Sequence, residues 1–202
     1  MSKDFVKCKY CKKIEKNNPE LIVRDCNEDN KISKSYIHIN CKVKQLKEQD
    51  SLDKLVSTII DIYNLQTPTD IPSLIYTKIN QIRNGTYKDN IKYKQGYSYS
   101  VIDYAFKMSS KDIDYSLNNK KFNVKVKNPQ NYLSAMRQKQ MLYGLAIVYS
   151  KLPLAYKELQ KISIKNKLKQ QEKDNQIIEM KELADVSFAP KEKQNKYDWL
   201  EG

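Results

Sequence analysis

Helical spacing of apolar residues dominates the chain from residue 43 onward. Apolar side chains recur at intervals of three and four between residues 43 and 63, which places them on one face of a helix. This period stops at Thr67-Pro68, and Asp70-Ile71-Pro72 then supplies an N-cap and a proline for the first turn of a second helix. The second helix is expected to end near Asn84-Gly85.

Further helices are predicted after residues 86–100, TYKDNIKYKQGYSYS, a polar and aromatic segment expected to be a loop or a short strand. A helix over Tyr99–Met108 should be followed by a cap at Ser109-Ser110 and by another short helix. Residues 120–129, KKFNVKVKNP, are expected to be extended. A long helix should then run from about Gln130 to Ser150, and Pro153 should bend or restart it.

These helices are expected to share one apolar core in a domain that folds independently of the rest of the chain, because their apolar faces are too large to leave in water. The predicted core residues are Leu55, Ile59, Ile75, Ile79, Ile102, Phe106, Leu133 and Leu142.

The N-terminal segment has a different pattern. Leu21-Ile22-Val23 forms a β-like apolar run, polar turn residues follow as far as Asn30, and residues 32–39 alternate like a returning strand. The pattern predicts a small hairpin.

Two pairs of potential metal ligands flank this hairpin. Cys8 and Cys11 are separated by two residues, as are His38 and Cys41, and His38 is the only histidine in the chain. Three thiols and an imidazole form a tetrahedral ligand set that Zn²⁺ prefers, and full ligation leaves no open position for a substrate. The sequence therefore predicts one structural zinc ion. Residues 5–45 resemble a half-LIM or treble-clef zinc finger, although the interval between the pairs is longer than is usual for a half-LIM.

Cys26 is the remaining cysteine. It could replace His38 as the fourth ligand, but it lies alone in a strand-like run, so we interpret it as a free thiol.

Beyond residue 160 the apolar residues thin out into a charged segment with too little apolar surface to fold alone. The predicted fold class is therefore mostly α. A small N-terminal zinc-stabilised β-hairpin finger (1–42) precedes a helical basic domain (43–160) and a flexible charged tail (161–202). No apolar run approaches the roughly 18 residues of a membrane span, and a cytoplasmic location in a bacterial host cell is expected.

The formal net charge of +13 favours a polyanionic partner. Lysine supplies most of this charge, and coding by an AT-rich genome would also enrich lysine. The distribution is more informative, because no acidic residue occurs from Tyr115 to Lys157. Tyrosines alternate with lysines just before this stretch, and that combination offers both base stacking and phosphate neutralisation.

Nucleic acid is therefore the predicted partner, with DNA favoured over RNA. The candidate contact residues are Lys88, Lys92, Tyr93, Lys94, Tyr97, Lys120, Lys121, Lys125, Lys127, Arg137 and Lys139. For a duplex, residues 131–139 are the best candidate recognition helix. The alternative interpretation is a solvated lysine-rich surface around an ordinary core.

Catalysis finds no support in the sequence. If His38 binds zinc, no histidine remains as a general base, and the four glycines form no phosphate-binding loop. A non-enzymatic protein is expected.

Residues 101–117, VIDYAFKMSSKDIDYSL, and 128–136, NPQNYLSAM, resemble the helical module of DnaD-like replication proteins and phage replisome organisers. Together with the N-terminal finger, the chain is also similar to small proteins of phages that infect low-GC Gram-positive bacteria. The resemblance implies DNA association and contact with a replicative helicase or its loader. It also implies that Tyr132, Leu133 and Met136 are core positions.

The C-terminal segment carries large apolar groups on an acidic background. We expect Tyr197, Trp199 and Leu200 to recruit a host or phage replication protein, while packing of Trp199 on the protein's own helices is the alternative. The predicted function is DNA binding in replication or a related transaction, together with recruitment of this partner. The alternative is a phage inhibitor that docks on a host defence, transcription or replication complex without binding nucleic acid itself.

Overall fold

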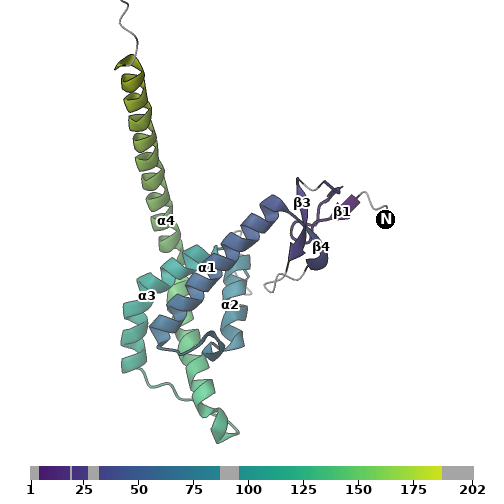
Figure 1. Ribbon diagram of the computed structural model, residues 1–202. Coiled ribbons are helices and arrows are strands. Elements are labelled where there is room, and N and C mark those ends of the chain that lie inside the picture. The colour runs from purple at the N-terminus through teal and green to yellow at the C-terminus, as the bar shows by residue number, and fades with distance from the viewer. Residues whose placement is uncertain (1–4, 19, 27–31, 87–95, 188–202) are drawn as a thin grey trace, which may run out of the picture. The chain divides into compact units, whose positions relative to one another are not determined.

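The computed structural model describes residues 5–18, 20–26, 32–86 and 96–187. The chain divides into two compact units, Met1–Tyr156 and Lys157–Gly202. The first unit contains a small β region followed by helices, and the second continues the last helix (Figure 1). This confirms the predicted fold class, mostly α with a small N-terminal β-hairpin region.

The β region, which we call the finger (residues 5–41), contains two hairpins where the sequence predicted one. Strands β1 (Phe5–Lys7) and β2 (Ile14–Lys16) pair antiparallel, as do β3 (Ile22–Cys26) and β4 (Ile32–His38). A bridge between Cys8 and Tyr36 joins the first hairpin to the second. Three-residue strands are too short to show alternation, so the first hairpin escaped prediction.

Two helices follow the finger as the apolar spacing predicted. Helix α1 (Ile39–Tyr63) begins directly after β4, and α2 (Ser73–Asn84) ends at Gly85, whose φ of 74° suits a residue without a side chain. The start of α2 differs from the prediction. Asp70 caps the short 3₁₀ helix η1 (Pro68–Asp70), because its carboxylate accepts a hydrogen bond from the Thr67 N–H at 3.0 Å.

Helix α3 (Tyr99–Asn119) is continuous, so the predicted break at Ser109-Ser110 is wrong. Both serines are accommodated within the helix. Ser109 is fully buried, and the Ser110 hydroxyl donates a hydrogen bond to the Lys107 carbonyl at 3.0 Å. Figure 1 shows α3 beside α1.

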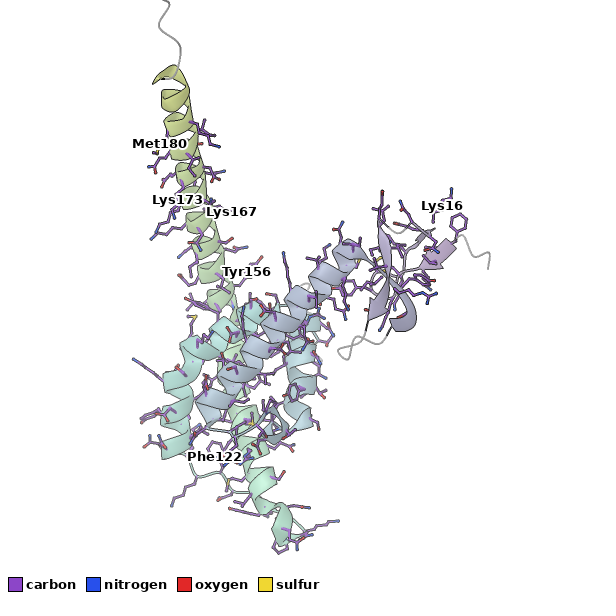
Figure 2. All side chains as sticks on the ribbon, viewed as in Figure 1. Lys16, Phe122, Tyr156, Lys167, Lys173 and Met180 are labelled. Carbon is purple, nitrogen blue, oxygen red and sulfur yellow. The ribbon has the colours of Figure 1, made fainter. Side chains whose placement is uncertain are left out.

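The last helix is longer than predicted. After an extended segment, the Asn128 side chain accepts a hydrogen bond from the Gln130 N–H and caps the 3₁₀ helix η2 (Pro129–Asn131). Helix α4 (Tyr132–Ser187) follows and includes Pro153, so the helix does not restart there. From residue 160 to 181 every described side chain of α4 is exposed, and Figure 2 shows Lys167, Lys173 and Met180 projecting from it. This helix therefore occupies much of the segment expected to be a charged tail.

The core of the helical bundle (α1 to α3 and α4 as far as Tyr156) is apolar. Of the predicted core, Leu55, Ile59, Ile75, Ile79, Ile102 and Phe106 are buried, and Leu142 is half-buried. A side chain added at Gly144 of α4 would place its Cβ 1.9 Å from the Tyr63 hydroxyl of α1, so glycine permits this close packing.

Leu133 is not part of this core. It is 78% exposed and Tyr132 is 40% exposed, so the core positions that the DnaD-like resemblance implied for these two residues are wrong. Both lie in the first turn of α4, whereas the first fully buried residue of that helix is Met141. Met136 is half-buried.

Within the described ranges, no helix combines the length and the apolar character that crossing a membrane requires.

Candidate functional site

Four side chains from three segments converge in the finger. Cys8 follows β1, Cys11 lies in the turn before β2, His38 ends β4, and Cys41 lies in the first turn of α1. Their ligand atoms all lie within 4.8 Å of one another. The Nδ1 atom of His38 is 3.3 Å from the Cys11 sulfur and 3.7 Å from the Cys41 sulfur. This grouping fits a metal site, on the residues that the sequence predicted.

The other nitrogen of His38 faces a carboxylate. Its Nε2 atom lies 3.1 Å from Oε2 of Glu15 on β2. If Nδ1 binds a metal, the ring proton must reside on Nε2, which lies within ion-pair distance of this carboxylate although the two groups are not aligned as a hydrogen bond. A small rotation that aligned them would hold the ring in the ligating orientation and make the ligating nitrogen more basic. Glu15 could not be predicted from the sequence, because nothing in its spacing links it to His38.

The thiols differ in their protonation. Burial raises the pKa of Cys8, but hydrogen bonds from the backbone N–H groups of Cys11, His38 and Tyr10 outweigh it and lower the pKa to about 6. Partial burial raises the pKa of Cys41 to about 11, and the neighbouring Cys11 and Cys8 add to this effect. The cluster therefore favours one thiolate but resists accumulating negative charge. A bound cation would remove that resistance.

A buried carboxylate joins two of the three ligand-bearing segments. Asp25 on β3 is only 3% exposed and pairs with Lys42 at 2.8 Å and with Lys9 at 3.0 Å. Hydrogen bonds from Lys42 and Lys9 lower its pKa. Since Lys9 follows Cys8 and Lys42 follows Cys41, these ion pairs hold both sides of the Cys/His cluster against the same strand.

Cys26 forms the last residue of β3, but its side chain lies outside the described part of the structure. Its interpretation as a free thiol therefore stays a prediction.

The predicted nucleic-acid residues are distributed over several environments. Lys88, Lys92, Tyr93 and Lys94 lie outside the described residues. Tyr97 is half-buried and its ring packs edge-on against Tyr156, with 6.2 Å between the centroids. Tyr97 therefore contributes to internal packing.

Three of the basic candidates make internal contacts. The Lys120 ammonium lies 4.0 Å from the centre of the Tyr143 ring and donates a hydrogen bond to its hydroxyl, which lowers the pKa of Tyr143. Arg137 pairs with Asp70 at 3.2 Å. Lys139 donates a hydrogen bond to the Asn123 carbonyl at 2.5 Å. These contacts anchor the extended segment and the start of α4.

Lys121, Lys125 and Lys127 have a different environment. All three are exposed, and none has an ion pair or hydrogen bond to another described residue. We call them the lysine row. Phe122, which lies between them in sequence, turns inward and packs edge-on against Tyr143 with 5.8 Å between the ring centroids.

The recruiting residues Tyr197, Trp199 and Leu200 lie beyond the described part of the chain, so their role stays a prediction.

Comparison with known families identifies the origin of the chain. The sequence model of the family described as SPbeta prophage protein YorH matches residues 8–199. The chain belongs to this family. The match begins at the first cysteine of the cluster and extends over both units, so the YorH family includes the finger as well as the helices. The chain is accordingly a phage protein. No curated protein and no solved structure matches it.

Proposed function

We propose that this YorH-family protein is a non-enzymatic nucleic-acid-binding protein that acts in phage replication or a related DNA transaction. In this proposal the lysine row contacts phosphates, and the finger is held together by a structural Zn²⁺ ion. The observation that supports the proposal is the row itself, whose three exposed lysines lie on an extended segment inside a stretch without acidic residues.

The backbone explains how the row arises. In extended chain, successive side chains point to opposite sides, and residues two apart are separated by about 6.6 Å. Phe122, Val124 and Val126 are half-buried, so Lys121, Lys125 and Lys127 all face solvent on the other side. The three lysine charges on this side repel each other, and a bound polyanion would reduce that repulsion. Binding would also release the counterions condensed on the polyanion.

The metal ion proposed for the finger is zinc. Three thiols and one imidazole nitrogen match the donor set of structural zinc sites, and soft thiolates disfavour Mg²⁺ and Ca²⁺. The finger also needs such an ion. Its buried apolar residues, among those described, are only Cys8, Ile22 and Ile37. Metal binding offsets a core of this size.

A salt series with labelled single-stranded and double-stranded DNA tests the nucleic-acid proposal. We expect tight binding at low salt that weakens steeply as salt rises. The triple variant Lys121→Gln, Lys125→Gln, Lys127→Gln should reduce the slope of log affinity against log salt by about 2, at about 0.7 for each phosphate contact on a single strand. The matched control replaces Lys167, Lys169 and Lys173 of α4, which are equally exposed. An equal loss in both variants, or no binding at low salt, would contradict the proposal.

A second candidate function, docking on a host protein complex, is favoured by a different surface. Ile39, Val43 and Leu46 follow helical spacing at the start of α1, yet they are 40%, 44% and 58% exposed. Exposed apolar patches of this kind often mark protein interfaces. Capture of host proteins from a lysate, with and without nuclease, separates the two functions. Partners retained after nuclease and lost in Val43→Ser, Leu46→Ser would favour docking.

A further inference from the structure

The first hairpin of the finger has an outer face that nothing in the described structure covers. Phe5 lies opposite Lys16 and Lys7 lies opposite Ile14 in the register of β1 and β2. Directly opposed residues, and residues two apart in one strand, share a face. These four side chains therefore form one surface, which we call the hairpin face. All four are exposed, with Phe5 at 54% and Ile14 at 55%.

The opposite face of the same hairpin is half-buried. Val6 lies opposite Glu15 in the register, and both side chains are half-buried. Glu15 is the residue that faces His38 Nε2 in the metal cluster. The contact between Glu15 and His38 therefore ties the opposite face to the Cys/His cluster, so the hairpin face is the one that turns outward.

The charge around the hairpin face is positive. Residues 5–16 contain five lysines, of which Lys9 pairs with the buried Asp25. The acidic residue of this range, Glu15, belongs to the opposite face. Lys7 and Lys16 thus flank Phe5 and Ile14 without a compensating carboxylate on their own face. Figure 2 shows Lys16 projecting from the end of the hairpin.

We propose that the hairpin face is a stacking platform for single-stranded nucleic acid. Phe5 offers an aromatic surface to an unpaired base, Ile14 extends that surface, and Lys7 and Lys16 neutralise the adjacent phosphates. Stacking on an aromatic side chain requires a base whose face is open, which a duplex does not offer. Single-stranded DNA and RNA share this chemistry.

A second copy of the chain fits the hairpin face poorly. Two copies would bring identical lysines together, and each chain carries a net charge of +13. A polyanion with flat apolar groups satisfies both the charge and the exposed ring. The inference rests on the proposed nucleic-acid function, but it concerns a contact surface separate from the lysine row.

The test uses the full-length, zinc-loaded protein with labelled oligothymidine, oligouridine and a DNA duplex. Phe5→Ala should weaken binding to the single strands by roughly tenfold, as expected for the loss of one stacking contact. Phe5→Tyr should restore binding. Lys7→Gln with Lys16→Gln should reduce the salt slope by about 1.4. Unequal affinities for oligothymidine and oligouridine would identify which nucleic acid the face prefers.

Matched controls come from α4, where Met180 and the pair Lys167 and Lys173 are exposed in the same way. Met180→Ala and Lys167→Gln, Lys173→Gln should leave affinity within about twofold, and zinc content should be unchanged in every variant. Because the substituted side chains are exposed, a change in affinity then reports contact and not misfolding.

The outcomes separate this inference from the proposed function. If wild-type protein binds the oligonucleotides and only the lysine-row variant has a lower affinity for them, the role of the hairpin face is rejected and the proposed function stands. If wild-type protein binds no oligonucleotide at low salt, both are rejected. An equal effect of Phe5→Ala on single strands and on duplex would overturn the stacking role.

Discussion

The finger and the helical bundle are stabilised by different kinds of interaction. Among the described residues, the bundle buries 16 apolar side chains, whereas the finger buries three. A fully buried large apolar side chain contributes about 1.5–3 kcal/mol, so apolar packing alone can stabilise the bundle. In the finger, the buried Asp25 and the four clustered ligands take the place of a core. A short module can therefore hold a defined shape through polar interactions, provided that a metal ion completes it.

Loss of one metal ligand should have the largest effect, and only on the finger. Cys11→Ser should abolish stoichiometric zinc in elemental analysis of protein purified without added metal. Structural zinc contributes on the order of 10 kcal/mol, which the three buried apolar residues cannot replace. Cys26→Ser is the control and should retain the metal. A Cys11→Ser protein that kept both zinc and thermal stability would show that the cluster is not the metal site.

Truncation of the bundle core should have the next largest effect, in the opposite region. Phe106 is 1% exposed, and Phe106→Ala should lower the free energy of unfolding by about 3–5 kcal/mol, because it leaves a cavity in the core. Denaturant titration followed by circular dichroism measures this change. The zinc content should stay at one ion per chain. Loss of zinc in this variant would mean that the finger depends on the bundle.

Removal of the Glu15 carboxylate next to His38 should have a smaller effect, which is again confined to the finger. Glu15→Ala should lower the zinc affinity by roughly 10–100-fold, because His38 loses the group that orients its ring. Competition with a chromophoric chelator measures this affinity. Glu20→Ala, which changes an exposed acidic residue elsewhere in the finger, is the control and should match wild type. Equal affinities in both variants would remove Glu15 from the metal centre.

Substitution at Leu133 should have the smallest effect. Its side chain is 78% exposed, so Leu133→Ser should change the free energy of unfolding by less than about 0.5 kcal/mol. Thermal unfolding compares this variant with Leu145→Ser, which changes a fully buried residue of the same helix. A loss of several kcal/mol at Leu133 would restore the core position that the DnaD-like resemblance implied.

The features that sequence reasoning predicted are those that local pattern controls. Helical spacing located α1 and α2, and the paired spacing of Cys8, Cys11, His38 and Cys41 predicted that these four side chains lie together, because a ligand set constrains residue type and interval together. The features it missed depend on tertiary contacts. Ser109 resembles a helix cap in sequence, yet it is fully buried inside the continuous helix α3.

The same limit applies to charged residues. Asp25 and Glu15 look like ordinary surface acids in the sequence, and only the fold brings them to Lys42 and His38. Likewise, the sequence grouped Arg137 with the lysine row, although it pairs with Asp70, a residue 67 positions away. Charge density along a sequence therefore indicates a basic region, but it does not separate structural ion pairs from exposed contact residues.

Removal of zinc from the intact protein tests the division between the two regions most directly. A chelator is added while amide resonances and far-ultraviolet circular dichroism are recorded on the same sample. We predict that the resonances of residues 5–41 collapse to unfolded positions, while the helical circular dichroism of the bundle is retained and zinc restores the finger. Loss of nearly all helical signal on chelation, or a finger that stays folded without metal, would contradict this division.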